Sequence, residues 1–241
     1  MNINDLDNLI REKEGMALSA AFPALMRKVY VWMTMALAIS GVMAYAVAAS
    51  PGLLQLIYGS RISIWVLIIA ELVLVWKISG SVYKENRSLT ATTLMFIIFA
   101  ALNGVTLSSI FVLFAPAAII KTFAVTAGTF GVMAAYGYFT SRDLTKIGGL
   151  LFMALIGVII ASVVNMFLHS SGLDLVVSII GVLVFVGLTA WDSQQIKMSL
   201  AMAPDLGETS QKLAVTGALS LYLDFINLFL YLLRFFGGNR D

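Results

Sequence analysis

Residues 147–168 read IGGLLFMALIGVIIASVVNMFL, and after HSSG at 169–172 the chain continues as LDLVVSIIGVLVFVGLTAW at 173–191. An α-helix of about 20 apolar residues crosses the roughly 30 Å of hydrocarbon in a bilayer. Each of the two stretches has this length, and the short polar break between them leaves room only for a tight hairpin. The pair therefore predicts two membrane-spanning helices.

The composition of the whole chain supports this class of protein. Only 12% of the 241 residues are charged and the mean hydropathy is +0.95, whereas a soluble domain carries about 25% charged residues. A soluble globule and a disordered chain are both excluded. The net charge of +2, with scattered basic residues, gives no basis for nucleic-acid binding, and the absence of cysteine excludes disulfides and thiolate sites.

Uncharged or nearly uncharged stretches of sufficient length occur seven times. Ala115 and Pro116 divide one long apolar run into the third and fourth of them, because proline interrupts a helix. The seven predicted spans are 25–49, 62–80, 89–114, 117–139, 147–168, 173–191 and 213–236. We therefore expect an all-α membrane protein, with a transmembrane domain over residues 25–237.

Residues 1–24 form a separate N-terminal segment. They contain four acidic residues and lack an early apolar core, so they do not have the pattern of a signal peptide. Apolar residues recur with weak helical spacing, which fits a short interfacial helix, but we expect a disordered cytoplasmic tail.

The distribution of basic residues predicts the orientation. With seven spans, eleven lysines and arginines fall on the side of the N-terminus and four on the opposite side. Because cytoplasmic loops carry the excess of positive charge, the N-terminus is expected in the cytoplasm and the C-terminus outside.

Three acids lie where the membrane disfavours charge. Glu71 and Asp224 are mid-span, and Asp192 lies at the cytoplasmic end of the sixth span. An aspartate at the centre of a membrane helix costs about 2.5–3.5 kcal/mol to insert. Such residues face a bundle interior or a watery path, either to carry out a function or to hold helices together.

Asp192 and Asp224 would share a proton if their carboxyl groups met, and when ionised they are oxygen ligands of the kind that calcium prefers. Asn227, one turn after Asp224, either adds an amide oxygen or makes an ordinary interhelical hydrogen bond. Whether the acids meet depends on helix length and tilt, because Asp224 lies about 16 Å deep if its helix begins at Leu213.

Arg87 lies at the cytoplasmic start of the third span, on the same side as Asp192. An Arg87–Asp192 ion pair would close the inner mouth, and protonation of Asp192 would release it, so that acid would open the pathway. The alternative is an arginine that faces lipid headgroups under the positive-inside rule.

Several segments resemble a known family. GALSLYLDFINLFLYLLRFFG at 217–237 is similar to the last span of the Bax inhibitor-1 family, and KVYVWM at 28–33 and GLTAWDSQQIK at 187–197 support the likeness. The resemblance covers about residues 24–237 and is closest to the bacterial branch, which implies a bacterial inner membrane.

The resemblance implies six helices wrapped around a central seventh, and a pH-sensitive calcium leak modulated by two aspartates. Those aspartates match Asp192 and Asp224. The latch arginine falls on Arg87, with a looser alignment, and the acid of the second span matches Glu71. Trp191 stands where the family commonly has tyrosine. The resemblance does not imply inhibition of Bax.

We therefore expect a calcium-permeable channel without a cofactor, whose partners are the bilayer, calcium and protons. A proton-coupled cation transporter is an alternative, because membrane acids suit it equally. A non-transporting protein that modulates a membrane-protein partner is another. An enzyme is not expected, since His169, the one histidine, lies in a hairpin without a suitable serine nearby.

Overall fold

The structure is a computed structural model that describes residues 3–84, 87–203 and 205–237, with the backbone alone for residues 3–20. In these residues all regular secondary structure beyond single bridges is helical. The helices are α1 (Ile3–Ala48), α2 (Pro51–Tyr58), α3 (Arg61–Ser79), α4 (Leu89–Leu107), α5 (Ser109–Leu113), α6 (Pro116–Phe139), α7 (Thr145–Leu168), α8 (Ser171–Ala201) and α9 (Glu208–Phe236).

Seven helical segments are long and apolar enough to cross a membrane, which confirms the predicted seven-span class. The third of them is divided into α4 and α5 at Ser108. Two boundaries differ in a way that affects the site. α8 continues ten residues beyond the predicted end at 191, and α9 begins five residues before the predicted start at 213.

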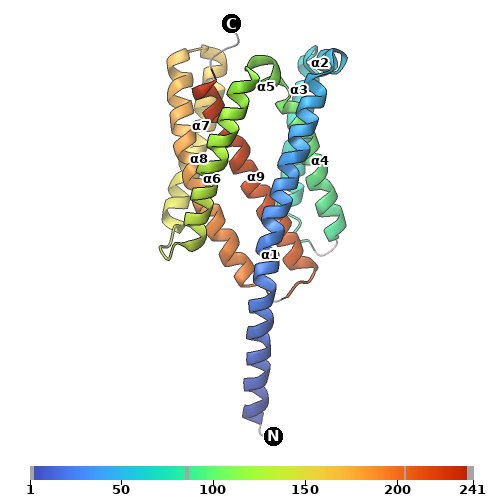
Figure 1. Ribbon diagram of the computed structural model, residues 1–241, viewed down its shortest axis with the longest axis vertical. Coiled ribbons are helices and arrows are strands. Elements are labelled where there is room, and N and C mark those ends of the chain that lie inside the picture. Colours follow the sequence, from blue (N-terminus) through green and yellow to red (C-terminus); the bar gives the residue numbers. More distant parts are fainter. Residues whose placement is uncertain (1–2, 85–86, 204, 238–241) are drawn as a thin grey trace.

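The N-terminal segment differs from its prediction. α1 begins at Ile3 and runs without a break into the first span, with Pro23 inside the helix. The expected disordered tail over residues 1–24 is therefore helical from Ile3 onward, and Figure 1 shows this part of α1 projecting from one end of the bundle.

Local sequence explains where several helices begin. The hydroxyl groups of Ser60, Ser88 and Ser170 each accept a hydrogen bond from a backbone amide in the first turn of α3, α4 and α8. Pro116 occupies the first turn of α6, where its missing amide hydrogen has no cost. The expected hairpin after the fifth span is confirmed, with His169 in the left-handed conformation (φ 50°) directly after α7.

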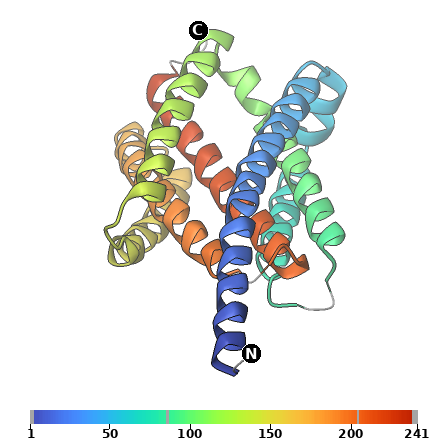
Figure 2. The ribbon, with the colours of Figure 1, turned by 60° about the horizontal axis from the view of Figure 1, so that its bottom comes forward.

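Helix α9 buries a larger share of its residues than any other span. In the described part of the chain it contacts α1, α3, α4, α6 and α8, whereas α7 packs against α8. Figures 1 and 2 show α9 running diagonally between the group of α6, α7 and α8 and the pair of α1 and α4. Six helices wrapped around a central seventh stay a prediction in that complete form.

The outer faces of the bundle are apolar. Trp65 and Trp76 on α3 and Phe139 on α6 are all more than half exposed. An apolar exterior of this kind matches hydrocarbon rather than water, so these faces are the lipid-contacting surface.

Candidate functional site

The side chains of Asp192 and Asp224 lie within hydrogen-bonding reach of each other. They come from α8 and α9, which run antiparallel and are joined by residues 202–207. Two carboxylates this close repel each other, so a proton on one of them stabilises the pair. The approach of the two acids, which the sequence left open, is thus present in the structure.

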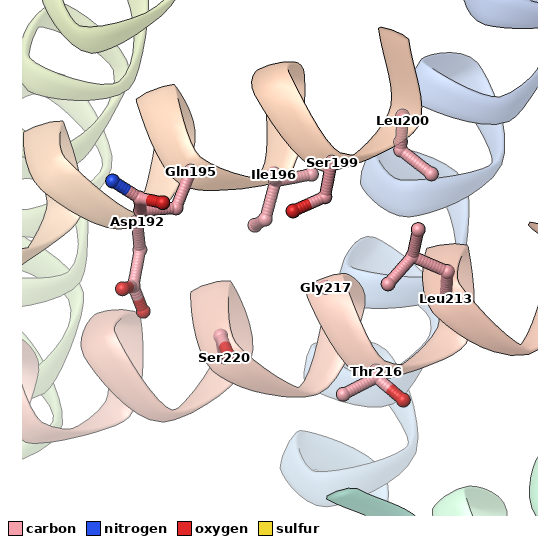
Figure 3. A pocket seen from close by; sticks show the side chains of 9 residues that line it. All are labelled: Asp192, Gln195, Ile196, Ser199, Leu200, Leu213, Thr216, Gly217 and Ser220. Carbon is pink, nitrogen blue, oxygen red and sulfur yellow. The ribbon is translucent and has the colours of Figure 1, made fainter. Parts of the chain in front are cut away.

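The two acids have different surroundings. Asp224 is 5% exposed, and its Oδ2 atom is buried without a hydrogen-bond donor from the described residues. Asp192 is partly exposed and lies on the wall of a cavity between α8 and α9. Figure 3 shows the Asp192 carboxyl group pointing from α8 toward α9 at one end of this cavity. Asp192 is therefore the more accessible acid.

The cavity has a volume of about 130 Å³. It lies between the facing sides of the two helices, and polar and apolar residues line it. They are Asp192, Gln195, Ile196, Ser199, Leu200, Leu213, Thr216, Gly217 and Ser220. The polar members other than Asp192 were not identified from the sequence, although they repeat along each helix on the side that bears the aspartate.

The expected latch between Arg87 and Asp192 is absent from the described part of the structure. The guanidinium group of Arg87 donates a hydrogen bond to the backbone carbonyl of Lys77 at the end of α3. Asp192 lies nine residues before the end of α8, which is about 14 Å along the helix axis. Asp192 is therefore set back from the end of α8, and the Arg87–Asp192 latch stays a prediction that this structure does not display.

Lys212 on α9 is bonded to the connection between α3 and α4, a role that the sequence did not indicate. It is 3% exposed, and its Nζ atom donates to the backbone carbonyl of Arg87 at 3.0 Å. Glu208, one turn earlier on α9, accepts from the backbone amide of Leu89. Polar side chains of α9 therefore hold the start of α4 through its backbone.

Glu71 belongs to a different polar cluster. Its carboxylate accepts hydrogen bonds from Thr106 Oγ1 at 2.5 Å and from Asn103 Nδ2 at 3.3 Å. The hydroxyl group of Tyr222 donates to Asn103 Oδ1 at 2.8 Å, and Ser40 Oγ lies 2.6 Å from the same hydroxyl. The structure thus connects Glu71 to α4, α9 and α1.

Asn227 does not join the aspartates. Its side-chain amide donates to the backbone carbonyl of Leu223 in its own helix, at 2.8 Å. The structure shows neither of the two expected roles for Asn227. These were an oxygen ligand beside Asp224 and a hydrogen bond to another helix. Within the described residues, no group of three or more histidines or acids could hold a metal ion.

Comparison with known proteins agrees with this architecture. The family described as inhibitor of apoptosis-promoting Bax1 matches residues 23–241, nearly the whole chain. The chain belongs to this Bax inhibitor-1 family. The resemblance noted from the sequence is confirmed.

Bacterial relatives of this Bax inhibitor-1 family member match over almost their full length. A protein of Borreliella burgdorferi is 47% identical over 97% of this chain and 99% of its own. Inner membrane protein YbhL of Escherichia coli K12 is 45% identical over 98% of this chain and 100% of its own. A Deinococcus radiodurans protein is 39% identical over 90% of each chain. This family member is an integral, multi-pass membrane protein.

Proposed function

We propose that this protein is a passive, calcium-permeable leak channel whose ion path passes the carboxyl groups of Asp192 and Asp224. The observation that carries the proposal is the contact of two acids from different helices inside a bundle of apolar spans. Intramembrane acids on facing helices are typical of ion and proton pathways. The expectation from the family resemblance points the same way.

The number of ligands supports a passing ion rather than a resident one. A calcium ion held tightly takes six to eight oxygen ligands, and the two aspartates contribute at most four. Conduction needs a site that attracts the ion yet releases it again. Two carboxylates supplemented by water meet this requirement, so calcium is a permeant ion here and not a cofactor.

The same pair makes the flux sensitive to pH. A proton shared by Asp192 and Asp224 occupies the oxygens that an entering calcium ion would contact. Protons and calcium therefore compete for one site, so that acid lowers the flux in this mechanism, opposite to the effect expected from an Arg87–Asp192 latch. Arg87 has no part in this mechanism, because its guanidinium group is bound to the Lys77 carbonyl.

We further propose a location in the bacterial inner membrane, because the E. coli relative is named an inner membrane protein. The N-terminus lies in the cytoplasm and the C-terminus outside, as the distribution of basic residues favours. The protein acts on ions rather than as an enzyme.

Calcium efflux from proteoliposomes at several pH values tests the channel and its sensor. We expect wild-type efflux to change with pH, and Asp192→Asn and Asp224→Asn to lose most of that dependence. Asp174→Asn is the matched control, because Asp174 lies on α8 but is half exposed beside Arg234 at 3.6 Å. It should keep the wild-type profile.

Three outcomes contradict the proposal. If both asparagine variants keep the pH dependence of the wild type, Asp192 and Asp224 are not the pH sensor. Calcium accumulation against its gradient, driven by an imposed proton gradient, indicates a proton-coupled transporter instead. A lack of flux together with stoichiometric copurification of a membrane protein indicates an interaction protein.

A further inference from the structure

The facing sides of α8 and α9 each carry a polar stripe that ends at an aspartate. On α8 the stripe consists of Asp192, Gln195 and Ser199, and on α9 of Thr216, Ser220 and Asp224. Spacings of three, four, seven and eight residues place side chains on one side of a helix. Apart from Asp224, all of these residues line the cavity between the helices, as Figure 3 shows.

Water is a more suitable occupant of this cavity than of a purely apolar void, because polar side chains lie on its walls. The cavity volume of about 130 Å³ is well above the roughly 10–15 Å³ that one water molecule needs. Asp224 Oδ2, beyond the end of the cavity, is buried without a hydrogen-bond partner from the described protein. Buried polar atoms of this kind are costly unless water or an ion satisfies them.

The cavity is elongated along the axis of α8. It extends along α8 from Asp192 to Leu200, one residue before the helix ends, a length of about 12 Å. The end of α8 and the start of α9 lie at the end of the bundle from which α1 projects (Figure 1). The cavity thus extends from Asp192 toward that end of the molecule, with Asp224 buried behind Asp192.

We propose that this cavity is a hydrated vestibule through which a divalent cation enters, meeting Asp192 first and Asp224 second. The inference rests on the proposed channel function and names its entry route. The hydroxyl groups of Ser199 and Ser220 and the side-chain oxygen of Gln195 replace part of the water around the ion. These are oxygen ligands of the kind that calcium accepts.

The chain contains no cysteine, so single cysteines introduced at the cavity can be probed without background. The test variants are Ser199→Cys and Ser220→Cys, one on each wall. Ser193→Cys is the matched control, because Ser193 adjoins Asp192 on α8 but is fully buried, and its hydroxyl group donates to the Ala134 carbonyl of α6. All three are made in the full chain and reconstituted in liposomes.

The probe is a small cationic methanethiosulfonate reagent, applied from the side on which the α8–α9 connection lies. Because the reagent attacks the thiolate, which forms only in contact with water, S199C and S220C should react at least about tenfold faster than S193C. Modification of S220C should also reduce calcium efflux severalfold, and S193C should keep its efflux under the same treatment.

If S199C and S220C react with the reagent no faster than S193C does, the cavity is not hydrated and the proposal is overturned. Fast reaction with unchanged calcium efflux overturns the entry route. A wild-type protein without any calcium efflux removes the channel function and the route together, whereas fast labelling would still show that the cavity is hydrated. Because the two variants lie on different helices, misfolding of one leaves the other to decide.

Discussion

Gly137 shows how a single residue sets the position of the site. It lies on α6 against the backbone of Ala190 on α8, and a β-carbon at this position would overlap the Ala190 carbonyl group. Ala190 is two residues before Asp192. The close approach of α6 therefore helps to hold the part of α8 that carries the acid.

Gly137→Ala should destabilise the protein by about 1–3 kcal/mol, because the obstructing atom belongs to backbone and cannot rotate away. Thermal unfolding in detergent measures the effect. Gly131→Ala on the same helix is the control, since a β-carbon there meets no atom within 4 Å. Equal unfolding temperatures for both variants would show that the approach of α6 and α8 is less tight than described.

At the scale of the helices, two polar clusters join elements that are distant in sequence. The first is the aspartate contact between α8 and α9. The second runs from Glu71 on α3 through Asn103 on α4 and Tyr222 on α9 to Ser40 on α1. Tyr222 is fully buried and packs edge-on against Phe96 and Phe99. Its hydroxyl group is the point where three helices meet.

Tyr222→Phe removes that hydroxyl group and keeps the ring. Hydrogen bonds between membrane helices contribute about 0.6 kcal/mol on average and up to about 1.7 kcal/mol. We expect a loss of stability near the upper value, because Asn103 and Ser40 both lose a partner. Detergent unfolding compares it with Tyr45→Phe, whose ring is 66% exposed on the lipid-facing surface. An equally large loss of stability in Tyr45→Phe would show that the hydrogen bonds of the Tyr222 hydroxyl group do not stabilise the protein.

Hydropathy located the spans but not every helix end. α8 continues through SQQIKMSLA at 193–201, a stretch that contains two glutamines and a lysine. There Gln194 Oε1 accepts from the backbone amide of Leu144, and Lys197 donates to the Tyr138 carbonyl. Contacts with the end of α6 and with the α6–α7 connection extend the helix, and no local sequence pattern specifies such contacts.

At the scale of the whole molecule, the charge distribution and the fold agree on how the chain crosses the membrane. An odd number of spans places the start of the first and the end of the last on opposite sides. Figure 1 shows these two points at opposite ends of the bundle. The eleven basic residues on the side of the N-terminus favour the proposed orientation, with that side in the cytoplasm.

A reporter that is active only outside the cytoplasm should be active when fused after Asp241 and inactive when fused before Met1. Activity of the two fusions in living bacteria measures the orientation. Fusion of the same reporter after Gly59, between the first two spans, is an internal control and should also be active. The opposite pattern would reverse the proposed orientation and place the α8–α9 vestibule outside.

The sequence by itself determined the class of this protein, its seven spans and the three acids that the membrane disfavours. Those properties depend on the transfer of local segments from water to lipid, which composition specifies. Only the tertiary structure decided that Asp192 lies close to Asp224, that Glu71 and Arg87 bond elsewhere, and that a cavity between α8 and α9 adjoins Asp192. These contacts depend on where helices end and how closely they pack, and backbone approaches such as that of Gly137 to Ala190 set them.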